Sequence, residues 1–156
     1  IQLTEPLEYA DPGEAKLLSR ISVTDAVDGD ISARARVSTL WATENKSVYS
    51  ATISVTNSMG DTARITLPVD VLPSNTYTGS IKLTKNMVYL KQGVKFRAGD
   101  YFSHMSLGST TLTRADGVEL ETVSDVDTST PGVYSVAITA RYNTVQAFTR
   151  LIVVVE

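Results

Sequence analysis

The sequence predicts an all-β fold, built as two β-sandwich domains in tandem. Apolar and polar residues alternate with a period of two in segments rich in Val, Ile, Thr and Tyr, which is typical of strands with one buried face. Gly, Pro, Asn, Asp and Ser gather between these segments, as expected for turns. Helical periodicity is almost missing, so the pattern favours a sandwich or barrel over alternating strands and helices.

Nine segments of the chain have the strand pattern. In chain order they are residues 17–23, 33–38, 48–56, 63–72, 81–84, 87–90, 117–123, 133–141 and 147–155. Turn residues between them lie at 28–30, 57–61, 73–75, 116–117 and 131–132. We expect a short helical turn only at residues 97–105.

An internal repeat sets the expected number of domains. Residues 48–53 (VYSATI) recur as residues 133–138 (VYSVAI), 85 positions later. A polar Pro-Ser-Asn stretch at residues 73–75 follows one strand and precedes the next. We therefore expect two immunoglobulin-like sandwiches, residues 1–74 and residues 75–156, each with six or seven short strands.

The composition excludes several classes of protein. The chain has 156 residues, of which 42% are hydrophobic and 20% charged, so a packed core is expected. It has no Cys and one His, which removes disulfides and severely limits zinc sites and Ser-His catalysis. A net charge of −3 argues against nucleic acid as a partner. No apolar run is long enough for a membrane span, and no leader opens the chain, so we expect an excised or mature segment.

Three segments resemble a known family: residues 23–32 (VTDAVDGDIS), residues 57–63 (NSMGDTA) and residues 130–136 (TPGVYSV). They are similar to the motifs of the bacterial surface Ig-like repeat family related to the hyalin repeat. The first domain matches the acidic turn and the hairpin of that family but lacks its Pro-Gly strand entry. The second domain keeps the Pro-Gly entry and has no Asp-Gly-Asp cluster, so we interpret it as a divergent copy.

This resemblance implies an extracellular or cell-surface module without catalytic residues or a cofactor. Such modules serve as spacers or adhesive segments of bacterial surface proteins and some secreted enzymes. The expected partners are other domains of the same polypeptide and a host protein or glycan. The alternative is a carbohydrate-binding accessory module of a secreted polysaccharide-degrading enzyme.

Three aspartates form the candidate metal site of the sequence. Asp25, Asp28 and Asp30 lie within six residues, and carboxylate oxygens on a turn are ligands that Ca²⁺ prefers. Their spacing differs from that of an EF-hand, and Asp is also common in turns because its side chain bonds nearby backbone. The three aspartates therefore have two interpretations, a hydrogen-bonded turn and a calcium site.

His104 and Trp41 are two further functional candidates. His104 follows Asp100 by four residues, but no nucleophile motif accompanies them, so we expect no catalysis. Trp41 is the one tryptophan and suits either a sugar-stacking face or the core. It falls opposite Val126 in the repeat, an apolar position in both copies, which favours packing.

Overall fold

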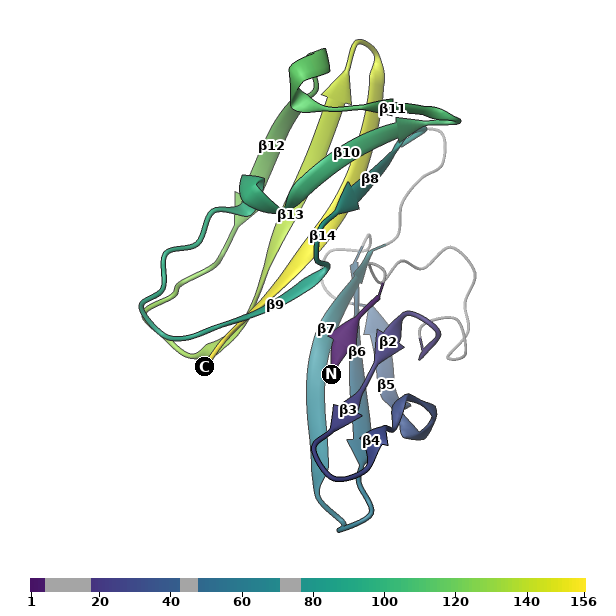
Figure 1. Ribbon diagram of the computed structural model, residues 1–156, viewed down its shortest axis with the longest axis vertical. Coiled ribbons are helices and arrows are strands. Elements are labelled where there is room, and N and C mark those ends of the chain that lie inside the picture. Colours follow the sequence, from purple (N-terminus) through teal and green to yellow (C-terminus); the bar gives the residue numbers. More distant parts are fainter. Residues whose placement is uncertain (5–17, 43–47, 71–76) are drawn as a thin grey trace. The chain divides into compact units, whose positions relative to one another are not determined.

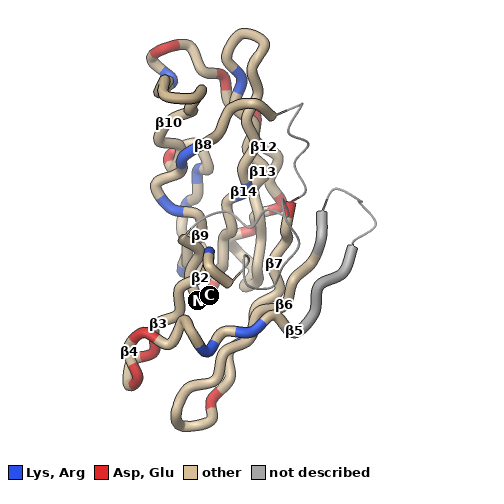
Figure 2. The backbone as a smooth tube through the Cα atoms, turned by 90° about the vertical axis from the view of Figure 1, so that its right-hand side faces the viewer, with Lys and Arg blue, Asp and Glu red and all other residues tan. Residues whose placement is uncertain are grey.

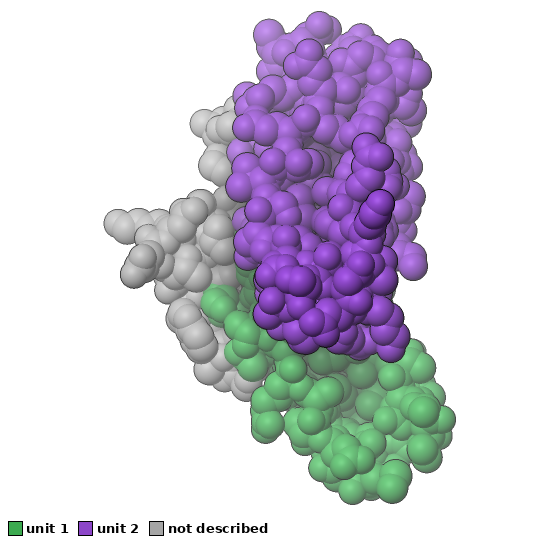
Figure 3. Space-filling model, turned by 90° about the vertical axis from the view of Figure 1, so that its left-hand side faces the viewer, with its two compact units in different colours: residues 1–72 green, residues 73–156 purple. Residues whose placement is uncertain are grey.

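The computed structural model describes residues 1–4, 18–42, 48–70 and 77–156, with the backbone alone for residues 38–42 and 48–49. The described chain is all-β and forms immunoglobulin-like β-sandwiches (Figure 1). It divides into two compact units, unit 1 (residues 1–72) and unit 2 (residues 73–156) (Figure 3). The expected domain boundary, between residues 74 and 75, lies outside the described residues.

Unit 1 contains one long antiparallel sheet and two short strand pairs. The sheet has the order β5-β6-β7, with β5 at Arg36–Ala42, β6 at Val48–Thr56 and β7 at Thr62–Asp70. The pairs are β1 (Gln2–Leu3) with β2 (Ile21–Ser22), and β3 (Thr24–Asp25) with β4 (Gly29–Asp30). A 3-10 turn, η1 (Ser32–Arg34), leads into β5.

Alternate residues of the long strands form the core of unit 1. The buried apolar side chains of β6 and β7 are Ala51, Ile53, Val55, Leu67 and Val69. Apolar residues of the segments before β5 are buried as well: Leu3, Ile21, Val23, Ile31 and Ala35. The period of two in the sequence therefore places one face of each long strand inward.

Unit 2 is a sandwich of a three-stranded sheet and a four-stranded sheet, β11-β10-β8 and β12-β13-β14-β9. The strands of the first sheet are β8 (Ser80–Leu83), β10 (Phe102–Leu107) and β11 (Thr110–Leu112). Those of the second are β9 (Met87–Leu90), β12 (Glu119–Ser124), β13 (Gly132–Tyr142) and β14 (Val145–Val155). Two 3-10 turns, η2 (Ala98–Tyr101) and η3 (Arg114–Asp116), connect them.

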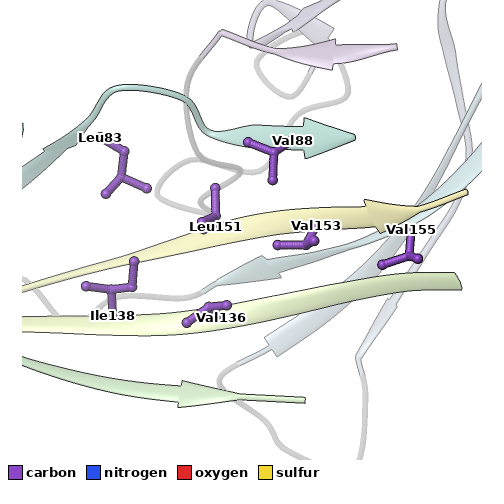
Figure 4. Packing of buried hydrophobic residues seen from close by; sticks show 7 residues of the cluster. All are labelled: Leu83, Val88, Val136, Ile138, Leu151, Val153 and Val155. Atoms are coloured by element: carbon purple, nitrogen blue, oxygen red, sulfur yellow. The ribbon is translucent and has the colours of Figure 1, made fainter. Parts of the chain in front are cut away.

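The core of unit 2 lies between its two sheets. Its largest cluster joins both sheets through Leu83, Val88, Val136, Ile138, Leu151, Val153 and Val155 (Figure 4). The chain crosses from one sheet to the other after β8, so that β9 pairs with β14. This β9–β14 pair is parallel, whereas every other described pairing is antiparallel.

The prediction for residues 97–105 was wrong in its second half. Only η2 is helical there, and β10 begins at Phe102. The pairing of β10 with β8 shifts register between Phe102 and His104. This bulge interrupts the alternation of apolar and polar residues, which hides the strand from a period-two search.

Candidate functional site

The residues from Asp25 to Asp30, here called the acidic turn, connect β3 and β4. Asp25 Oδ1 accepts hydrogen bonds from the backbone N–H groups of Val27 (2.8 Å) and Asp28 (2.9 Å). Gly29 has a φ of 72°, a conformation that glycine adopts without steric cost. Figure 2 marks the acidic positions along the backbone between β3 and β4 in red. The local sequence therefore folds the turn around its own first carboxylate.

Asp28 ties the acidic turn to the hairpin between β6 and β7. Its Oδ1 accepts the Ser58 hydroxyl (2.6 Å), and its Oδ2 accepts the Ser58 N–H (2.7 Å) and Arg34 Nη1 (2.8 Å). A second link joins Asn57 Nδ2 to Asp25 Oδ2 (3.2 Å). Two loops that lie about thirty residues apart in sequence are thus held as one hydrogen-bonded group.

Asp30 closes the acidic turn toward η1. Its Oδ1 accepts both the N–H (2.9 Å) and the hydroxyl (2.6 Å) of Ser32, and Ser32 Oγ in turn accepts the N–H of Val23 (2.9 Å). Unit 2 repeats this Asp-x-Ser arrangement, since Asp127 Oδ1 accepts the N–H and hydroxyl of Ser129. The three aspartates accordingly share a structural role in shaping loops.

Hydrogen bonds lower the pKa of each aspartate of the acidic turn. For Asp25 the largest cause of the lowered pKa is the N–H of Asp28, followed by the N–H of Val27. The Ser58 hydroxyl is the main cause of the lowered pKa of Asp28, and the Ser32 hydroxyl is the main cause for Asp30. All three carboxylates are therefore stabilised in the ionised form that accepts these bonds.

Donors of the protein itself occupy most carboxylate oxygens of the acidic turn. Each aspartate directs at least one carboxylate oxygen to donors of the protein itself, and Asp25 and Asp28 use both oxygens in this way. Within the described parts of the chain, no group of three or more His, Asp or Glu side chains is arranged to hold a metal ion. The turn reading of Asp25, Asp28 and Asp30 accounts for the contacts that the structure shows.

Sequence reasoning missed Asn57 and Ser58 as partners of the acidic turn. Their segment was identified as a hairpin, but local spacing contains no signal that a residue thirty positions away accepts their hydrogen bonds. A shallow pocket of about 200 Å³ opens beside this contact. Its walls combine apolar and polar side chains, among them Val23, Asp25, Ile31, Val55, Asn57 and Asp61.

His104 lies on a strand, so no helical turn brings it beside Asp100. Asp100 belongs to η2, and His104 lies on β10 opposite Lys82 of β8. The Oγ of the neighbouring Ser103 lies 3.0 Å from Nδ1 of His104. The two residues therefore do not form the acid-base pair that a helix would have produced.

The described aromatic side chains do not build a flat exposed platform. Tyr77 and Phe148 meet at a tilted angle of 48°, and Arg150 lies over the Phe148 ring at 5.8 Å. Phe96 and Tyr101 stack against each other beside the core cluster of unit 2. The side chain of Trp41 lies outside the described residues.

Comparisons with known proteins place the chain in no family. No protein-family model matches it, and no curated protein matches its sequence. Among solved structures it is similar to the protocadherin gammaB7 EC3-6 cis-dimer, at 8% identity and a TM-score of 0.33. The likeness covers 100% of this chain and 49% of the protocadherin chain, so this chain spans about half the length of the protocadherin chain. None of the described helices is both long and apolar enough to cross a membrane. At this TM-score the likeness carries no argument about function.

Proposed function

We propose that the chain is a non-catalytic spacer and presentation module of a larger bacterial cell-surface or secreted protein. The motifs of residues 23–32, 57–63 and 130–136 support the bacterial and extracellular setting, because they resemble a family of surface repeats. The path of the chain through each unit supports the spacer role. The same proposal includes a more specific role, adhesion to a host protein or glycan.

In unit 2 the chain enters at one end of the sandwich and leaves at the other. The N–H of Gly79 donates to the carbonyl of Gln146, next to the start of β14. At the other end of that strand, the N–H of Glu156 donates to the carbonyl of Leu90. Gln146 and Glu156 are ten residue steps apart along β14 and its end, or about 33 Å at ~3.3 Å per residue.

Unit 1 has the same property. Ile1 lines the pocket that also contains Asp61 and Thr62, where β7 begins. Asp70, the last described residue of β7, lies at the far end of that strand. A unit whose ends lie apart in this way adds its own length to a polypeptide, and this observation carries the proposal.

A surface-display experiment tests the spacer role. The chain is inserted between a cell-wall anchor and an epitope tag, and antibody access to the tag is measured by flow cytometry. We expect greater access than with a Gly/Ser linker of about 40 residues, because a flexible chain of that length has a root-mean-square span of only about 35 Å, roughly that of one folded unit. Ile138→Asp, which places a charge in the core, provides a matched unfolded control. Equal access for the folded chain and the flexible linker would contradict the proposal.

The carbohydrate-binding alternative makes a different prediction. Such a module retains soluble or insoluble polysaccharide through exposed aromatic faces. A panel of plant and bacterial polysaccharides, measured by affinity electrophoresis, separates the two functions. Retardation that is lost on replacing Tyr77 and Phe148 by Ala would favour the alternative.

A further inference from the structure

Strand β12 forms an outer edge of the four-stranded sheet in unit 2. It pairs with β13 over six successive residues and has no neighbour on its other side among the described strands. Most of the strand is exposed, and Val123 keeps 67% of its surface accessible. The strand therefore presents a free backbone edge to solvent.

Two flanking hydrogen bonds show which backbone groups face outward. The N–H of Asp125 donates to the carbonyl of Ser135 on β13, whereas the N–H of Val118 points the other way, to Thr113. Because these groups alternate along an antiparallel strand, the even-numbered residues direct their N–H and C=O groups away from β13. The free edge is thus formed by Leu120, Thr122 and Ser124.

Other long edge strands of the described chain carry features that hinder pairing. Strand β7 contains Pro68, which lacks an N–H group, and β5 has a register shift between Val37 and Thr39. Strand β12 contains no proline, and its pairing with β13 runs from Glu119 to Ser124 without a shift. Its backbone is therefore regular enough to accept a further strand.

The protection of this edge is electrostatic. Between residues 116 and 127 the sequence has five acidic residues and neither Lys nor Arg. Glu119 and Glu121 lie on the outer face of β12, where the neighbouring charged group is Arg141 of β13, 2.8 Å from Glu121. Both side chains of that ion pair are about half exposed, so it neutralises the edge only in part. Negative charge disfavours pairing with a second copy of β12 and favours a basic strand.

We propose that the free edge of β12 binds an extended basic segment of another polypeptide as an added strand. Lys or Arg at alternate positions of that segment lies beside Glu119 and Glu121 on the outer face. β-Branched residues between them lie beside Leu120 and Thr122 on the inner face. The backbone of the segment bonds to Leu120, Thr122 and Ser124. This binding role goes beyond spacing, and the spacer proposal does not depend on it.

Three synthetic ten-residue peptides test the proposal on the whole chain. The probe alternates Lys with Val, the first comparator alternates Glu with Val, and the second alternates Lys with Gly. We expect saturable binding of the probe alone, measured by fluorescence anisotropy at low salt. Amide exchange at Leu120, Thr122 and Ser124, followed by NMR, should slow by roughly tenfold or more, while that of Glu119 and Glu121 changes little.

Two variants locate the binding to the edge. Thr122→Pro removes the central outward N–H group and should abolish binding, with retained folding checked by circular dichroism. The double variant Glu119→Gln with Glu121→Gln keeps the backbone and should weaken binding roughly three- to tenfold. Asp61→Asn removes an acidic group of unit 1 and serves as the matched control with unchanged affinity.

Several results would overturn the proposal. If the Lys-Gly peptide bound as tightly as the Lys-Val probe, charge alone would account for binding, without strand addition. Protection of amides elsewhere would place the site off this edge. Protection of the same three amides without peptide, together with dimers in sedimentation, would mean that the strand pairs with its own copy.

Discussion

Thr149 places a hydroxyl group in the core of unit 2. Its side chain is 2% exposed, and Oγ1 has no hydrogen-bond partner among the described residues. Replacing it by Val exchanges that hydroxyl for a methyl group of the same shape. We expect Thr149→Val to raise the free energy of unfolding by about 1 kcal/mol, measured by urea denaturation. Thr139→Val, on the half-buried outer face of β13, should change it by less than about 0.5 kcal/mol. A loss of stability in Thr149→Val would show that the hydroxyl is satisfied.

Asp28 makes the stability of unit 1 sensitive to acid. Its pKa is lowered in the folded state by Ser58 and Arg34, so its contribution is fully present above the unfolded pKa of about 3.9. That contribution is lost as the pH falls through the lower folded value. We expect the free energy of unfolding to decline below about pH 4, and Asp28→Asn to flatten this decline.

The acid dependence is measured by urea denaturation between neutral and strongly acidic pH. Asp61→Asn leaves the contacts of Asp28 in place and is the control variant. An identical decline in Asp28→Asn and the unchanged protein would mean that other carboxylates account for it.

Buried residues alternate with more accessible ones along the central strand β13. Its neighbour β12 has no buried residue, and most of its residues are exposed. Ile138 is 1% exposed within the core cluster of unit 2, whereas Val123 on β12 is 67% exposed. Truncating the buried side chain removes packing and leaves a cavity. We expect Ile138→Ala to lower the free energy of unfolding by about 2–5 kcal/mol. Val123→Ala should change it by less than about 0.5 kcal/mol, and similar losses at both sites would contradict this assignment of the core.

The β6–β7 and β13–β14 hairpins show how hairpin length changes the sequence offset between the two repeats. Ile53 and Ile138 occupy matching buried positions at an offset of 85, but their cross-strand partners, Ile65 and Thr149, differ by 84. From one paired residue to the other, the chain is therefore one residue shorter in the β13–β14 hairpin than in the β6–β7 hairpin. The shorter hairpin changes which residues pair across the strands. The same face of each strand still points into the core.

The sequence predicts the long strands well and the irregular ones poorly. Strands β6 and β9 have the predicted bounds: β6 alternates without interruption, and β9 is a short apolar run bounded by polar residues. Strand β10 is hidden by its bulge, and the two-residue strands near Asp25 are too short to show a period. The contact between Asp28 and Ser58 joins distant loops, so only the folded chain reveals it.

At the scale of the whole molecule, the chain divides into units with separate cores. We expect residues 1–74 and residues 75–156 to fold independently, because each unit buries apolar residues within its own strands. Circular dichroism of the two fragments should show β-rich spectra with cooperative melting. If neither fragment folds while the whole chain melts in one step, the boundary is misplaced or the units depend on each other.

The parallel pairing of β9 with β14 gives unit 2 resistance to tension. When its two ends are pulled apart, β9 is drawn one way and β14 the other, along the strands and across their hydrogen bonds. The bonds of this pair must then break together. Attachment at Gly132 and Val155, which are paired neighbours at one end of β13 and β14, instead opens bonds one at a time. Single-molecule pulling should therefore need a higher rupture force between residues 79 and 156 than between residues 132 and 155. A protein that holds others away from a surface in flowing liquid would be loaded in the stronger direction.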